Sequence, residues 1–93
     1  MRSGNSSQSI DEAATAHMLK EGADGWTKSL ARVARMRAVK IVGSPRTSPA
    51  IRMVQYYIET PSGPYLLQCM APTDAWPLYS SLFARIISSI QFL

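Results

Sequence analysis

Residues 51–72 read IRMVQYYIETPSGPYLLQCMAP, and they determine the class of fold. β-Branched and aromatic side chains fill residues 51–60, as is typical of a strand. The next four residues, Pro61-Ser62-Gly63-Pro64, have the composition of a hairpin loop. Residues 65–71 then return as a further strand that ends at Pro72. The stretch therefore predicts an antiparallel pair of strands.

Upstream of this hairpin, residues 36–42 contain Val39, Ile41 and Val42 and predict another strand. The turn-rich loop 44–49 separates it from the next strand, and so short a connection favours antiparallel neighbours. The preceding segment, residues 26–34, is ambiguous. Its apolar residues fit a helix at i, i+4 and i+7 as well as an irregular strand, so both conformations stay open.

A helix is expected at each end of the chain. Ser9 and Glu12 form a capping box before a helix over residues 10–21, and Gly22 is its expected stop. Residues 1–8 are polar and are expected to form a disordered tail in front of a single domain spanning residues 9–93.

After Pro72, Thr73 or Asp74 is the expected cap of a C-terminal helix, and Pro77 is tolerated in its first turn. An apolar stripe follows at helical spacing. It consists of Trp76, Tyr79, Leu82, Phe83, Ile86, Ile87 and Ile90. The predicted fold class is α+β, with a three-stranded antiparallel meander flanked by an N-terminal and a C-terminal helix.

Both faces of the predicted sheet are apolar. In residues 51–60, Val54, Tyr56 and Ile58 alternate with Met53 and Tyr57 on the opposite face. We expect the two helices to cover one face and a second chain to cover the other, because a large apolar patch is unusual on a monomer. A homodimer through a sheet face or a sheet edge is therefore predicted.

Composition excludes several classes of protein. The 93 residues are 46% hydrophobic, and no apolar run is long enough to span a bilayer. The first residues, MRSGNSSQS, lack the apolar segment of a secretory signal, which favours the cytoplasm. A single cysteine, Cys69, excludes an internal disulfide.

The positive charge is concentrated. Ten Lys and Arg residues face six Asp and Glu residues, and residues 28–52 contain no acidic side chain. A basic patch is predicted at Arg32, Arg35, Arg37, Lys40, Arg46 and Arg52. It suits nucleic acid or an acidic protein, but the same segment has no aromatic residue for base stacking, which disfavours nucleic acid.

The sequence offers little for catalysis. His17 and Cys69 would be the only Cys–His pair, and spacing supplies no third group to orient the base. No phosphate-binding, metal-binding or nucleophile motif is present, so we expect a protein without catalysis, cofactor or metal.

A small amphipathic ligand is an alternative, in a gap between the C-terminal helix and the sheet. The candidate ligand-binding side chains are Trp26, Tyr56, Tyr57, Trp76, Tyr79 and Phe83.

Residues 39–93 resemble the C-terminal half of PsbP-like domains. The likeness rests on a Gly-Pro turn at Gly43 and Pro45, paired aromatics at Tyr56 and Tyr57, and a hairpin at Gly63. Further similar features follow along the chain. These are Ala71-Pro72, the helix residues Asp74, Trp76, Tyr79 and Phe83, and the tail Ile86–Phe92.

This family includes extrinsic photosystem proteins, a Ran-binding nuclear import factor and bacterial lipoproteins. The resemblance implies an abbreviated PsbP-like fold and a non-enzymatic role in assembly or binding. Strands that usually precede the first helix of the family have no counterpart here. Their lack would leave a sheet edge open, which also favours pairing between chains.

Overall fold

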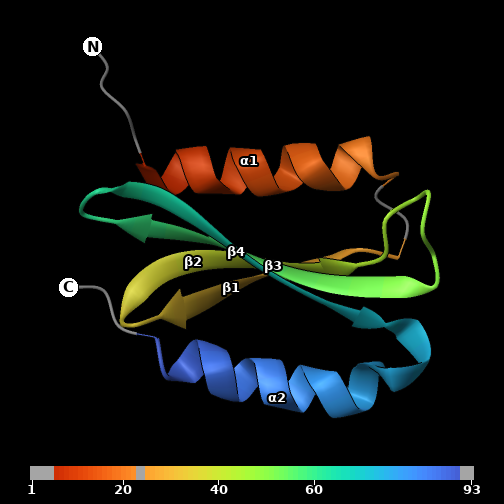
Figure 1. Cartoon of the computed structure of the whole chain (residues 1–93). Helices are drawn as coiled ribbons and strands as arrows, with labels where there is room; N and C mark the ends of the chain where they lie inside the picture. Colours follow the sequence, from red (N-terminus) through yellow and green to blue (C-terminus); the bar gives the residue numbers. More distant parts are fainter. Residues whose placement is uncertain (1–5, 23–24, 91–93) are drawn as a thin grey trace.

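The computed structural model describes residues 6–22 and 25–90. A single antiparallel sheet lies between two long helices (Figure 1). The elements in chain order are α1 (Ser6–Lys20), β1 (Thr27–Val33), β2 (Met36–Gly43), β3 (Ile51–Thr60), β4 (Gly63–Pro72), a short 3-10 turn (Thr73–Ala75) and α2 (Trp76–Ser88). The four strands follow one another in the sheet in the order β1-β2-β3-β4.

The predicted α+β meander is confirmed, with one more strand than expected. The three predicted strands are β2, β3 and β4. The ambiguous segment forms β1, which pairs antiparallel with β2 from Thr27 opposite Val42 to Val33 opposite Met36. The meander therefore has four strands instead of three, with β1 and β4 at its two edges.

The N-terminal helix is longer than expected. It begins at Ser6, so Ser9 lies inside the helix and the expected capping box at its start is wrong. The expected tail, residues 1–8, overlaps the helix from Ser6 onward, and residues 1–5 lie outside the described part of the chain. The predicted stop at Gly22 is confirmed: its φ of +98° ends the helix, and its N–H donates to the carbonyl of Leu19.

The C-terminal helix starts without a side-chain cap. The Thr73 hydroxyl donates instead to the carbonyl of Pro49, at 2.9 Å, and so ties the 3-10 turn to the loop before β3. The expected cap at Thr73 or Asp74 is therefore wrong. Pro77 does lie in the first turn of α2, where its missing N–H leaves no helical bond unmade.

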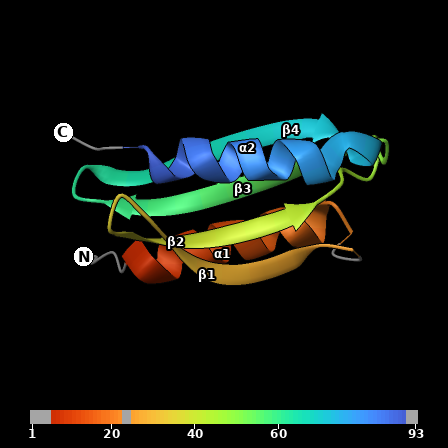
Figure 2. The same cartoon turned by 90° about the horizontal axis from the view of Figure 1, so that it is seen from below.

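The two helices lie on opposite faces of the sheet (Figures 1 and 2). The core under α1 consists of Ile10, Ala14, Trp26, Val39, Ile41 and Met53. The core under α2 consists of Val33, Ala38, Val54, Tyr56, Ile58 and Ile87. The expectation that both helices share one face is wrong, and each apolar face of the sheet has its own helix.

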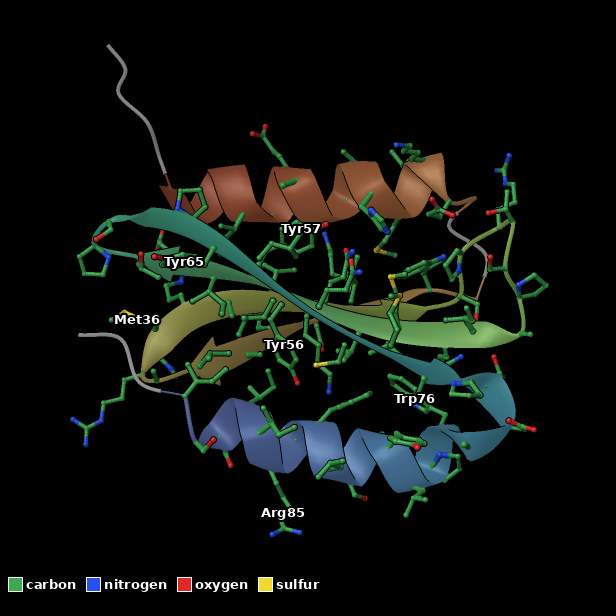
Figure 3. All side chains as sticks on the ribbon, viewed as in Figure 1. Met36, Tyr56, Tyr57, Tyr65, Trp76 and Arg85 are labelled. Atoms are coloured by element: carbon green, nitrogen blue, oxygen red, sulfur yellow. The ribbon has the colours of Figure 1, made fainter. Side chains whose placement is uncertain are left out.

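Strand alternation assigns side chains to the two layers as predicted. Met53 and Tyr57 pack on the α1 side, whereas Val54, Tyr56 and Ile58 pack on the α2 side. Figure 3 shows Tyr57 directed toward α1 and Tyr56 directed toward α2. The central strands β2 and β3 are therefore covered on both faces, whereas β1 and β4 remain largely exposed at the two edges of the sheet.

Candidate interaction surfaces

Three of the predicted ligand-binding aromatics gather between α2 and the sheet. Tyr56 of β3 and Trp76 and Phe83 of α2 line one small cavity of about 90 Å³. The rings of Trp76 and Phe83 meet edge to face, with centroids 5.8 Å apart. Ligand pockets usually hold about 300 Å³ or more, so this space has the size of a packing gap in an aromatic core.

The other three predicted ligand-binding aromatics lie elsewhere. Tyr79 contacts Phe83 at 6.1 Å between centroids but is itself exposed on the outer side of α2. Trp26 and Tyr57 belong to the layer under α1, on the far side of the sheet. The six residues therefore do not form one site.

Trp26 is held between α1 and the sheet. Its ring contacts His17 edge to face, with centroids 5.3 Å apart. A Cβ at Gly43 would overlap the indole ring, so Trp26 occupies the space that a side chain there would need. The indole Nε1 of Trp26 and Nε2 of His17 are buried without a hydrogen-bond partner among the described residues.

A Cys–His pair is not formed. His17 lies on the α1 side of the sheet, beside Trp26. Cys69 packs in the layer under α2, and burial raises the pKa of its thiol. The sheet therefore separates the two groups. Among the described residues, no three His, Cys, Asp or Glu side chains are close enough together to hold a metal ion.

A chain of hydrogen bonds lies under α1. The Tyr57 hydroxyl donates to Oε1 of Gln55 at 2.8 Å, and Nε2 of Gln55 donates to Oε1 of Gln68 at 2.6 Å. Gln55 is only 2% exposed, and both ends of its amide are satisfied by these bonds. Burial raises the pKa of the Tyr57 hydroxyl.

The predicted basic patch divides into separate groups. Arg32, Arg35 and Arg37 gather at the hairpin between β1 and β2, where Arg32 lies directly opposite Arg37. Lys40 lies 5.8 Å from the ring centroid of Tyr56, and Arg52 lies 5.8 Å from that of Trp76, both on the α2 side.

Arg46 belongs to neither of these groups. Its backbone N–H donates to the carboxylate of Glu21 at the end of α1. Among the six residues of the predicted basic patch, those at the hairpin are therefore the ones that concentrate positive charge in one place.

The two edges of the sheet differ in charge. Strand β1, TKSLARV, carries Lys28 and Arg32, whereas β4, GPYLLQCMAP, carries no charged side chain. On β4, the apolar residues Tyr65, Leu66 and Met70 are each about half exposed. The β4 edge is therefore an uncharged strand with apolar side chains in solvent.

One flank of α2 carries further exposed apolar side chains, on the face of the sheet that Tyr65 shares, whereas Leu66 and Met70 lie on the α1 face. Leu78 is 74% exposed, and Tyr79, Leu82 and Ile86 are also exposed. The opposite flank, at Ser80 and Ala84, turns toward Lys40 and Val42 of β2. The apolar flank is thus on the side of α2 that lies along β4 (Figure 2).

Sequence reasoning missed this flank, because it assigned most of the apolar residues of α2 to one buried stripe. A signal for it was available in the charges. No charged residue occurs between Glu59 and Asp74, and Arg85 is the single charge of α2. An edge strand and helix with so little charge are unusual on a solvated surface.

Comparison of the chain with protein-family models, with curated proteins and with solved structures gave no match. The resemblance to PsbP-like domains stays a prediction. Within the described residues, neither helix is long and apolar enough to cross a membrane.

Proposed function

We propose that this chain is a non-catalytic assembly protein that pairs with a second copy of itself along the β4 edge and the apolar flank of α2. The observation that carries the proposal is an edge strand of ten residues without any charge. Of the two predicted routes to a dimer, a sheet face or a sheet edge, the proposal keeps the edge, since α1 and α2 cover the two faces.

An open edge strand presents unpaired N–H and C=O groups to any other extended chain. Natural monomers protect such edges with charged side chains, prolines or bulges. Strand β1 has two cations along its edge. Strand β4 has only Pro64 and Pro72 near its ends, and residues 65–71 between them are uncharged and free of proline. This segment is suited to main-chain pairing.

A second copy is the occupant that the charges favour. A two-fold dimer places a strand antiparallel to itself, so each side chain meets side chains of the same strand. Two copies of β4 meet without like-charge repulsion, whereas two copies of β1 would bring Lys28 and Arg32 against the same cations. Self-pairing through β4 would join two four-stranded sheets into one.

The same two-fold axis would bring the two α2 helices together. Because the apolar flank of α2 lies on the β4 side, Leu78, Leu82 and Ile86 of each copy would turn toward the other helix. A standard interface buries about 800 Å² on each partner, roughly an eighth of the 6039 Å² that this chain exposes. Strand pairing and helix packing would together bury the exposed apolar side chains of β4 and α2 in such an interface.

Light scattering on the purified chain tests the proposal. The expected molar mass is twice the 10.3 kDa of one chain. Leu66→Lys on β4 and Leu82→Lys on α2 should each shift the mass toward one chain, because both place a charge where the copies meet. The matched control is Leu30→Lys, on the exposed side of β1, which should stay dimeric.

Circular dichroism must show that the variants remain folded. A monomer of the wild-type chain up to about 1 mM would contradict the proposal, because a weaker Kd leaves less than about 4 kcal/mol of association free energy. Retention of the dimer in both lysine variants would place the interface elsewhere and would also contradict it.

A further inference from the structure

The opposite edge of the sheet combines an exposed strand with a group of arginines. Residues 27–30 of β1 are all exposed, and Leu30 is 82% exposed. Lys28, Leu30 and Arg32 occupy every second position of this strand, and their side chains share its α1 side. The Lys28 ammonium already bonds Asp11 at 2.9 Å and Thr15 at 2.9 Å. The exposed apolar side chain of Leu30 therefore lies next to Arg32, a cation that forms no ion pair with an acidic side chain among the described residues.

Two features of the hairpin are unfavourable for the isolated chain. Arg32 and Arg37 are directly opposite each other across β1 and β2, where like charges destabilise a sheet. The two-residue turn holds Ala34 at a φ of +52° and Arg35 at a φ of +70°. Glycine or asparagine usually occupies such positions, because other side chains are strained there.

Strain of this kind is often retained where it serves a function. The turn places Arg35 at the tip of the hairpin. The guanidinium of Arg32 donates to the Arg35 carbonyl at 3.2 Å, which holds a second arginine against the turn. Three guanidinium groups are thus collected within six consecutive residues, from Arg32 to Arg37.

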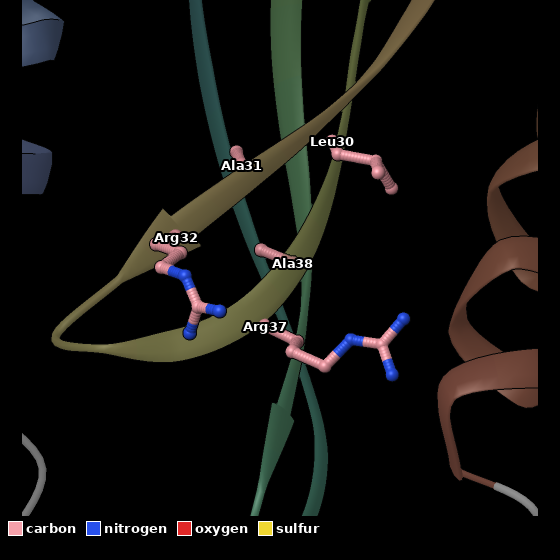
Figure 4. A pocket seen from close by; sticks show the side chains of 5 residues that line it. All are labelled: Leu30, Ala31, Arg32, Arg37 and Ala38. Atoms are coloured by element: carbon pink, nitrogen blue, oxygen red, sulfur yellow. The ribbon is translucent and has the colours of Figure 1, made fainter.

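A hollow of about 290 Å³ adjoins these arginines. It is lined by Leu30, Ala31, Arg32, Arg37 and Ala38 (Figure 4). In Figure 4 the side chains of Leu30 and Arg37 extend to the same side of the hairpin, toward α1. The hollow therefore combines an apolar wall with guanidinium groups beside an open strand edge.

We infer that β1 binds an extended acidic peptide segment as an added strand, with its carboxylates at the hairpin arginines. An edge strand supplies main-chain donors and acceptors to such a segment, and alternate side chains give specificity. Arginine guanidinium groups pair well with carboxylates. An apolar residue of the peptide lies on Leu30, and an acidic residue two positions along lies at Arg32.

The observations favour a peptide over the two other occupants. A second copy of this chain would bring its own β1 cations against Arg32. Single-stranded nucleic acid binds by stacking bases on aromatic rings. The exposed aromatics that the structure describes, Tyr65 and Tyr79, belong to β4 and α2 at the other edge. Because the two edges are separate, this inference does not depend on dimerisation.

Fluorescence anisotropy with a defined probe tests the inference. The probe is the labelled peptide Thr-Glu-Thr-Val-Thr-Glu-Thr, titrated with the full chain near physiological salt. We expect saturable binding that weakens about tenfold in Arg32→Glu, because one carboxylate loses its charge partner. Leu30→Ser should weaken binding severalfold. The matched control Arg85→Glu makes the same charge change on α2 and should bind as the wild type does.

Arg35→Gly separates recognition from folding. It relieves the strain at a positive φ, so the variant should resist urea better than the wild type. Its affinity for the probe should nevertheless fall about threefold, because a guanidinium is lost from the site. A more stable variant with unchanged affinity would overturn the assignment of Arg35.

Two control peptides test the mode of binding. Gln in place of Glu should abolish binding if charge selects the peptide, and Pro in place of the inner Thr residues should do so if main-chain pairing holds it. Equal binding of either control, or no binding of the probe up to about 1 mM, would overturn the inference. It would also be overturned if oligo-dT bound more tightly than the probe, with a steep salt dependence typical of phosphate contacts.

Discussion

The indole ring of Trp26 fills the space above Gly43, and this contact joins the start of β1 to the end of β2 under α1. Gly43→Ala should lower the free energy of unfolding by about 2 to 3 kcal/mol, because the new methyl group overlaps the ring and forces a shift in a packed core. Urea unfolding followed by circular dichroism, at one fixed protein concentration, measures the change.

A double-mutant cycle identifies the cause of that loss. In the double variant Gly43→Ala/Trp26→Leu the smaller side chain leaves room for the methyl group. The double variant should therefore lose less free energy of unfolding than the sum of the losses in the two single variants. Strict additivity would show that Trp26 is not what excludes a side chain at Gly43.

Tyr57 gives stability a dependence on alkaline pH. Burial raises the pKa of its hydroxyl above the ordinary value of 10.0, so above about pH 10 the unfolded chain loses this proton before the folded chain does. The folded state then binds more protons than the unfolded state, and the free energy of unfolding falls as pH rises.

Tyr57→Phe removes this dependence together with the hydrogen bond to Gln55. The variant should be about 1 kcal/mol less stable than the wild type at neutral pH, and the difference should narrow above pH 10. Urea midpoints from pH 8 to pH 11 measure it. Parallel curves for the two proteins would contradict the role of Tyr57.

At this scale the sequence predicts which side chains share a strand face, but not what covers that face. Alternation correctly separates Tyr56 from Tyr57, because successive residues of a strand point in opposite directions. Grouping both with Trp26 and Trp76 in one ligand site required knowing which helix lies on which face. That is set by the path of the chain around the sheet and leaves no local pattern.

The turn between β1 and β2 could be stabilised by one substitution. Ala34 has a φ of +52°, which asparagine tolerates better than alanine. Ala34→Asn should raise the free energy of unfolding by about 0.5 to 1 kcal/mol. Thermal unfolding measures this, and a loss of stability would show that the turn is not of the type with positive φ at both central residues.

The same turn explains why the sequence left the β1 segment open between a helix and a strand. Ala34 and Arg35 give none of the glycine, proline or asparagine signals by which a hairpin is recognised. The strand itself, TKSLARV, buries only Val33, so it lacks a clear period of two. The strands β3 and β4 were predictable because their β-branched and aromatic residues flank a Pro-Ser-Gly-Pro loop.

The caps of the helices were harder to predict than the helices themselves. The helix α1 begins at Ser6, before the expected cap, and the Thr73 hydroxyl donates to a carbonyl in the loop before β3. Both outcomes depend on partners distant in sequence or on small differences in free energy at a helix end, which one local motif does not determine.

As a whole molecule, the protein has a sheet with one helix on each face and two edges that differ in charge. The number of apolar sheet faces was predicted correctly, and so was the need for two covers. The identity of the covers was not, because two helices of one chain can lie on the same face or on opposite faces. With both faces covered, the uncharged β4 edge and the arginine-bearing β1 edge are the surfaces on which our proposals rest.

Hydrogen exchange of the β4 backbone amides, followed by NMR at increasing protein concentration, tests the central claim most directly. In an unpaired edge strand every second N–H points to solvent and exchanges quickly. Pairing of two β4 strands predicts that the fast amides among residues 65–71 become protected as the concentration rises, while the outward amides of β1 stay fast. An alternating pattern in β4 that persists at all concentrations would contradict assembly through this edge.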